Sequence, residues 1–187
     1  PLGYYAGEIL ASGINFLEGT LGFVLIPLLA ATMPFIVMTG MHHALTPIFL
    51  STFALTGYDS LILLSQVCAN LAQGGASLAV GMKSKNQDMK QLATASGVSA
   101  LMGITEPAIY GVTLKLKKPM IAAVIGAGIA GLYASIMNVK IYVLNNSILT
   151  ALAMADGTTN LINGLIMIVL SIAVPFILVF LLGTNES

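Results

Sequence analysis

LINGLIMIVLSIAVPFILVFLL, residues 161–182, is a run of 22 residues without a charged side chain. A helix needs about 20 apolar residues to cross the hydrocarbon core of a bilayer. Two further runs, LGFVLIPLLAATMPFIVMTG (residues 21–40) and MIAAVIGAGIAGLYASIMNV (residues 120–139), also lack charge. Each of the three runs is therefore predicted to cross a membrane once.

The high share of hydrophobic residues and the low share of charged residues also favour a membrane protein. Hydrophobic residues make up 57% of the chain and charged residues only 7%, whereas a soluble domain carries about 25% charged residues. The formal net charge is zero and there is no arginine, so no basic face is available for nucleic acid. The single cysteine, Cys68, has no second thiol to pair with, and we interpret it as a small buried hydrophobic residue.

A fourth uncharged run, Leu61 to Met82, contains more polar and small residues. It includes Gln66, Asn70, Gln73 and a pair of adjacent glycines. Small residues and amides suit a helix that faces other helices instead of lipid. We predict that this run is a fourth crossing.

The lysines indicate how the chain is oriented. Six of the seven lie in two clusters, Lys83-Lys85-Lys90 and Lys115-Lys117-Lys118, and lysine-rich short loops usually face the cytoplasm. The segment between them, Gln91 to Leu114, must then leave and return on the same side. Its centre holds Gly103 and Pro107, which interrupt a helix, so a re-entrant hairpin is predicted here.

The same argument places Met41 to Asp59 on the outer side, where Pro47 and Gly57 interrupt an apolar stretch. This is a second predicted hairpin. Broken segments that enter from opposite faces build midplane binding sites in transporters. The Ile141–Asn160 stretch is expected to be an outer-side helix or loop. The predicted fold class is thus an all-α membrane protein with about four transmembrane helices plus two re-entrant helical hairpins.

Glu106, in GITEPAIYG (residues 103–111), is the strongest candidate for a binding residue. A carboxylate at membrane depth costs about 2.5–3.5 kcal/mol on insertion scales, so it requires a partner or a purpose. Pro107 fixes the backbone after it, and Gly103 permits close approach. We favour a ligand contact over a buried carboxylate satisfied by helix amides. Thr105 and Tyr110 are weaker candidates that suit capping or packing equally well.

His42 and His43 begin the outer hairpin in TGMHHALTP. Adjacent residues point in different directions on a regular backbone, so we expect one histidine to reach a cavity and the other to bond locally. A histidine satisfied within the core remains an alternative. A zinc site is disfavoured because no third ligand accompanies the pair.

Asn70 and Gln73 are three residues apart and share a helix face, where their amides suit either a polar solute or helix-to-helix hydrogen bonds. The candidate set contains no cation cluster, metal-ligand set or nucleophile triad. A neutral polyol is the predicted ligand, with no metal and no cofactor. An aromatic face such as that of Tyr110 can lie against a sugar ring.

GITEPAIYG resembles the signature loop of the membrane (IIC, or EIIC) subunits in the glucose and β-glucoside superfamily of the bacterial phosphotransferase system. GMHHALTP (residues 40–47) is similar to that family's histidine element, and NLAQGGASLAV (residues 70–80) lies between the two. The resemblance covers residues 20 to 182. It implies that 1–187 is the C-terminal, sugar-binding part of such a domain, with a lead-in at 1–20, membrane segments at 21–182 and a polar tail at 183–187.

The resemblance also implies an activity. Such a multi-pass permease moves a sugar across the bacterial inner membrane and releases it to a phosphocysteine on a IIB domain, with IIA upstream. The chain would then be one subunit of a phosphocysteine–sugar phosphotransferase, a homodimer at full length. Cys68 does not match the phosphorylated cysteine, which is therefore expected outside this chain. The substrate-binding residues carried over are Glu106, His42, His43, Asn70 and Thr105.

Two questions stay open at this point. Glu106 is the one candidate for a catalytic role, as the group that draws the proton from the attacking hydroxyl. The competing functions are a proton- or ion-coupled secondary transporter, with Glu106 as the coupling charge, and a purely structural membrane subunit. β-Glucosides, sucrose, trehalose and glucose-type sugars all fit the candidate residues.

Overall fold

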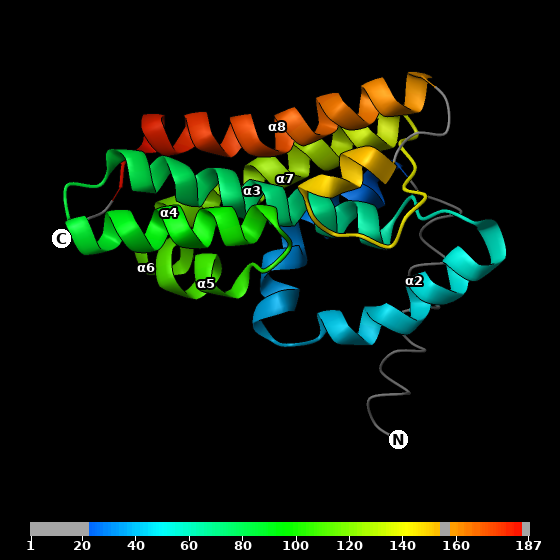
Figure 1. Cartoon of the computed structure of the whole chain (residues 1–187), viewed down its shortest axis with the longest axis horizontal. Coiled ribbons are helices and arrows are strands. Elements are labelled where there is room, and N and C mark those ends of the chain that lie inside the picture. Colours follow the sequence, from blue (N-terminus) through cyan, green and yellow to red (C-terminus); the bar gives the residue numbers. More distant parts are fainter. Residues whose placement is uncertain (1–22, 154–157, 185–187) are drawn as a thin grey trace.

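The computed structural model describes residues 23–153 and 158–184, and within these ranges all regular structure is helical (Figure 1). The predicted lead-in at 1–20 and most of the predicted tail at 183–187 lie outside the described residues. The helices are Phe23–Met38, α2 (His42–Thr56), α3 (Ile62–Lys83), α4 (Gln87–Leu101), α5 (Glu106–Ala108), the π-helix Ile109–Thr113, α6 (Leu114–Leu116), α7 (Lys118–Ile136), the 3-10 helix Ile148–Ala153 and α8 (Thr158–Leu182).

Helix α3 lies at the centre of the bundle, in contact with α4, α7 and α8 (Figure 1). Nearly all of its residues are buried, including the polar side chains of Asn70 and Gln73. Gly75 allows α8 to approach, because a Cβ atom there would collide with the backbone carbonyl of Ile172. Gly81 does the same for Thr94 of α4. The polar, glycine-containing run thus forms a helix that faces other helices along most of its surface.

The segment between the lysine clusters folds back on itself. Asn86 caps α4, since its Oδ1 accepts from the backbone N–H groups of Asp88 and Met89 at 2.9 and 3.2 Å. The α4 helix ends before Gly103, whose φ of +94° is accessible mainly to glycine. Helices α5 and α6 then return to the end of the bundle where α3 joins α4 (Figure 1). Both lysine clusters therefore lie at the same end.

The prediction of a re-entrant hairpin at Met41 to Asp59 is wrong, because the segment does not fold back on itself. Residues 42–56 form one continuous helix, α2, which runs through Pro47 without a break and ends at Gly57 with φ +79°. Proline removes one backbone N–H, and the other bonds of the helix are sufficient to carry α2 past it. The helix diverges from the main bundle (Figure 1), and Leu45 is its one buried residue.

Helices α7 and α8 are, among the described residues, the two that are long and apolar enough to cross a membrane. Ile121, Ile125 and Ile129 are exposed at four-residue spacing along α7. This is the pattern of a helix stripe that faces an apolar solvent. The C-terminal end of α8 is capped by Lys83 of α3, whose Nζ donates to the Phe180 carbonyl at 2.8 Å. The length and composition of α7 and α8 thus favour a helical membrane protein.

Asp59 fixes the turn between α2 and α3. Its Oδ1 accepts from the backbone N–H groups of Leu61, Leu63 and Leu64 at 2.8 to 3.2 Å. Its own backbone exchanges two hydrogen bonds of 2.9 Å with Ile141. The second interaction draws the segment after α7 onto the start of α3. The described part of the Ile141–Asn160 stretch before α8 is accordingly a loop that ends in the 3-10 helix Ile148–Ala153, and the last three residues of the stretch already belong to α8.

Two glycines of α7 provide a matched test of helix packing. An added Cβ at Gly126 would collide with the ring of Pro175 on α8, whereas at Gly128 the nearest atom is the Ala31 Cβ at an ordinary 3.6 Å. We expect Gly126→Ala to lower the free energy of unfolding by about 1–3 kcal/mol through overpacking. Gly128→Ala should be neutral or stabilising by up to about 1 kcal/mol, because alanine favours the helix. Thermal unfolding in detergent measures the stability of both variants. Equal unfolding midpoints for Gly126→Ala and Gly128→Ala would contradict the close packing of Gly126 against Pro175.

Candidate functional site

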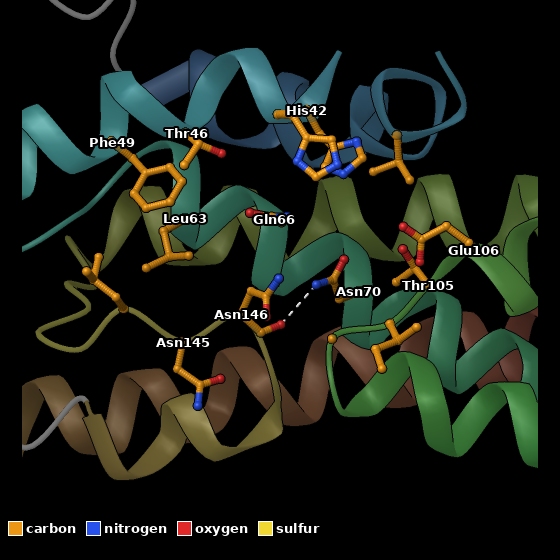
Figure 2. Close-up of a pocket in the computed structure, with 15 residues that line it drawn as sticks. His42, Thr46, Phe49, Leu63, Gln66, Asn70, Thr105, Glu106, Asn145 and Asn146 are labelled. Atoms are coloured by element: carbon orange, nitrogen blue, oxygen red, sulfur yellow. Dashed lines mark hydrogen bonds between the residues drawn. The ribbon is translucent and has the colours of Figure 1, made fainter. Parts of the chain in front are cut away.

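A cavity of about 460 Å³ opens between α2, α3, the turn before α5 and the loop that follows α7 (Figure 2). This volume lies within the range of about 300–1,000 Å³ that is usual for small-molecule sites. The five residues predicted to bind substrate all line it: His42, His43, Asn70, Thr105 and Glu106. The structure thus brings together groups that are up to 64 positions apart in the sequence.

Glu106 lies at the first position of α5, directly after the turn that reverses the chain. The turn is held by the Ile104 N–H, which donates to the Ser99 carbonyl at 3.0 Å. Thr105 is only 4% exposed, whereas Glu106 is exposed and reaches the open part of the cavity (Figure 2). A solvated carboxylate in this position can accept hydrogen bonds from two neighbouring hydroxyl groups.

The two histidine rings stack at a centroid distance of 4.0 Å with a tilt of 38°. The prediction that only one of them reaches the cavity is wrong, because both line it. Burial lowers the pKa of His42, as does the neighbouring His43, while the carboxylate of Glu106 raises it. Within the described residues, His42 Nδ1 is buried without a hydrogen-bond partner. A neutral imidazole offers one donor and one acceptor to a solute.

Asn70 connects the cavity floor to the loop after α7. Its Nδ2 donates to the Asn146 carbonyl at 2.9 Å (Figure 2). On the other side, a Cβ atom at Gly103 would meet Asn146 Oδ1 at 2.5 Å. Asn146 is therefore held between α3 and the turn that carries Glu106, and Asn145 beside it lines the same cavity.

The contacts decide two alternatives that the sequence left open, in favour of helix-to-helix bonding for Gln73 and of packing for Tyr110. Gln73 does not share the cavity with Asn70; it accepts from Thr113 Oγ1 at 2.8 Å and so joins α3 to the π-helix. Tyr110 does not line the cavity either, because its hydroxyl donates to the Met38 carbonyl at 3.0 Å. The aromatic residue at the cavity is Phe49 of α2.

Sequence reasoning missed Thr46, Phe49, Gln66, Asn145 and Asn146 as cavity residues. Thr46 and Phe49 follow His42 at the spacing of one helix face. A prediction of one continuous helix here would therefore have placed all three side chains on the same side. The asparagines reach the cavity through the backbone pairing of Asp59 with Ile141, which has no local sequence signature. Among the described residues, no three His, Cys, Asp or Glu side chains gather as ligands for a metal ion.

The geometry defines a helical membrane protein with a polar cavity lined by a carboxylate, two imidazoles and several amides. Comparison with known proteins gives the family. The family described as "Phosphotransferase system, EIIC" matches residues 1–128. The chain belongs to the EIIC family of the phosphotransferase system.

Curated relatives match along the whole chain. It is 42% identical over 187 residues to the β-glucoside-specific EIIBCA component of Bacillus subtilis, covering 100% of the chain and 30% of that protein. It is 36% identical over 190 residues to the arbutin-, cellobiose- and salicin-specific EIIBC component of Escherichia coli, covering 100% and 39%. The sucrose-specific EIIBC component of B. subtilis is 36% identical over 189 residues, with 100% and 41% covered.

The chain therefore spans between 30% and 41% of the length of these three relatives. No solved structure matches it.

The Asn70–Asn146 hydrogen bond yields a testable prediction. Asn70→Ala should lower the free energy needed to open the loop after α7 by about 1 kcal/mol, the usual net value of one hydrogen bond. Hydrogen exchange at the bonded amides of Asn145 and Thr150 should then accelerate by about fivefold or more. Gln66→Ala, on the same face of α3, is the control and should leave these amides unchanged. Equal acceleration in both variants would contradict a specific role for Asn70.

Proposed function

We propose that this chain is the sugar-binding part of a bacterial phosphotransferase permease. A sugar binds in the cavity, crosses the inner membrane and is released to a phosphocysteine on a IIB domain, which phosphorylates it. Membership of the EIIC family supports this function. So do relatives that are named as EIIBC or EIIBCA components specific for β-glucosides, sucrose, or arbutin, cellobiose and salicin.

The observation that carries the proposal is the convergence of Glu106, His42 and Thr105 on one cavity. A sugar presents adjacent hydroxyl groups, each of which both donates and accepts. Glu106 accepts from two of them, while the imidazole of His42 and the hydroxyl of Thr105 complement the remaining groups. With His43 and Asn70, these residues are the proposed substrate-binding set. We further propose Glu106 as the group that takes the proton of the sugar hydroxyl as that hydroxyl attacks the phosphocysteine.

The proposed topology has four crossings: the Phe23–Met38 helix, α3, α7 and α8. The lysines at the α3–α4 turn and around α6 face the cytoplasm by the positive-inside rule. The hairpin from α4 to α6 then enters from that side, and the turn before Glu106 lies at membrane depth. The α2 helix occupies the opposite side, where the sequence predicted a hairpin. All of residues 21–182 belong to one domain in this proposal.

The proposed partners follow from the same comparison. Fusion of EIIB to EIIC in the named relatives supports a IIB domain, in the same or a separate chain, as the partner that donates the phosphoryl group, with IIA upstream. The lysine-rich end of the bundle is the proposed face toward that domain, because a phosphorylated partner carries negative charge. A homodimer at full length completes the proposal.

Binding of labelled glucosides and disaccharides to the full-length protein in detergent tests the function. Glu106→Gln keeps the side-chain volume but removes the charge, so sugar affinity should fall by about tenfold or more, the value of about 1.5–3 kcal/mol for a hydrogen bond to a charged group. Asp88→Asn is the control, since it removes an exposed charge near the lysine-rich end of the same hairpin.

The outcomes separate the possibilities. Failure of the wild-type protein to bind any sugar would overturn the proposal. Binding that is indifferent to Glu106→Gln would remove Glu106 from the site. Uptake that persists without phosphoenolpyruvate and collapses with the membrane potential would favour an ion-coupled transporter instead.

A further inference from the structure

One face of α3 is polar from the cavity to deep inside the bundle. Four polar side chains follow one another at spacings of three and four residues and so share this face: Gln66, Asn70, Gln73 and Ser77. The first two line the cavity, whereas Gln73 is 1% exposed and Ser77 is fully buried. Because α3 continues to Lys83, this polar face runs from the cavity toward the lysine-rich end of the bundle.

The two buried members of this face are poorly satisfied. Gln73 accepts from Thr113 Oγ1 at 2.8 Å, but its Nε2 donates to the Met120 thioether, a weak acceptor, at 3.4 Å. The Ser77 hydroxyl has no hydrogen-bond partner among the described residues. Buried helical serines can donate to the carbonyl four residues earlier, as Ser171 does at 2.8 Å. Since an unpaired buried hydroxyl costs free energy, these groups suit a second state in which this face is hydrated.

A narrow gap leads from the cavity to this buried part of α3. Asn70 and Thr105, which lie at the Glu106 end of the cavity (Figure 2), also line this gap. Gln73 and Ile109 continue the lining, and the gap has no room for a water molecule. A path from the cavity toward Gln73 is thus present but closed in this structure.

The wall opposite Gln73 is the π-helix Ile109–Thr113, which packs against α3, α4 and α7. A π-helix interrupts the regular α-helical hydrogen bonds and occurs often at functional sites. The segment that contains it is bracketed by two positive φ values, +94° at Gly103 and +62° at Lys117. The Lys117 value is strained for a residue with a side chain, and strain of this kind clusters at switch regions. Residues 104–116 are therefore suited to move as a unit.

We infer that a sugar leaves the cavity between α3 and the π-helix, toward the lysine-rich end, and that the Gln73–Thr113 hydrogen bond is the gate across this path. The inference rests on the proposed function and specifies how its substrate reaches the phosphorylated partner. When residues 104–116 move away from α3, the Gln73 amide and the Ser77 hydroxyl become available to water and to the hydroxyl groups of the sugar. Closure restores the 2.8 Å bond and seals the cavity floor.

The accessibility of a thiol at position 77 tests the gate. Ser77→Cys is made in the full-length protein in detergent, and its reaction with a water-soluble methanethiosulfonate is followed by mass spectrometry. Native Cys68 is the internal control, because it is fully buried nine positions earlier, on the opposite face of α3. The thiol at position 77 should react measurably, whereas Cys68 should not.

Loss of the gate bond should speed this reaction. Thr113→Val keeps the side-chain shape but removes the hydroxyl, so the rate at position 77 should rise about fivefold, the equivalent of about 1 kcal/mol for one hydrogen bond. Gln73→Met removes the same bond from the α3 side and should act alike, whereas Thr113→Ser keeps the hydroxyl and should leave the rate unchanged. Ser96→Ala is the matched control, since the buried Ser96 hydroxyl donates to backbone carbonyls of its own helix.

The outcomes separate a gate from a loosened bundle. A faster reaction at position 77 with Cys68 still inert upholds the gate. An unchanged rate at position 77 in Thr113→Val and Gln73→Met, or a parallel rise at Cys68, would overturn it. Sugar binding by the wild-type protein, together with a thiol at position 77 that stays as inert as Cys68 in every variant, would remove the gate and leave the proposed function standing. Failure of the wild-type protein to bind any sugar would overturn both.

Discussion

Neighbouring helices lie unusually close to α3, and this close packing sets the arrangement of the whole bundle. Helices in a membrane gain little from apolar burial against lipid, so they associate through backbone proximity and van der Waals packing. Gly75 lets the α8 backbone at Ile172 lie directly against α3, and Gly126 does the same for Pro175 between α7 and α8. With these helices fixed around it, α3 has one face left near its start, and that face carries Leu63, Gln66 and Asn70.

Polar contacts then complete the cavity around this face. A buried backbone group without a partner is costly, and the loop after α7 satisfies two such requirements at once. Its Ile141 exchanges hydrogen bonds with Asp59, and its Asn146 carbonyl accepts from Asn70. Both anchors hold the loop onto α3, which places Asn145 at the cavity. The same contacts that satisfy the backbone therefore also build the binding surface.

Much of this could be predicted from the sequence where the signal is local. The uncharged run at 120–139 corresponds to α7 at Lys118–Ile136, and the run at 161–182 lies within α8 at Thr158–Leu182. The reversal at Gly103 was also accessible, because Gly103 and Pro107 interrupt a helix between two lysine clusters that are expected to face the same side. The continuity of α2 through Pro47 and the arrival of Asn146 beside Asn70 were not, since both depend on contacts between distant segments.

Helix α2 is the wall of the cavity that packs least against the rest of the protein. Helix α3 is buried on nearly every side, whereas α2 buries only Leu45 and lies apart from the bundle. A solute that contacts His42 on α2 together with Glu106 or Asn70 adds contacts between these walls that the empty protein lacks. Because a ligand favours a conformation only through differential affinity, a sugar bound between these walls, as proposed, would stabilise the arrangement with α2 held against α3.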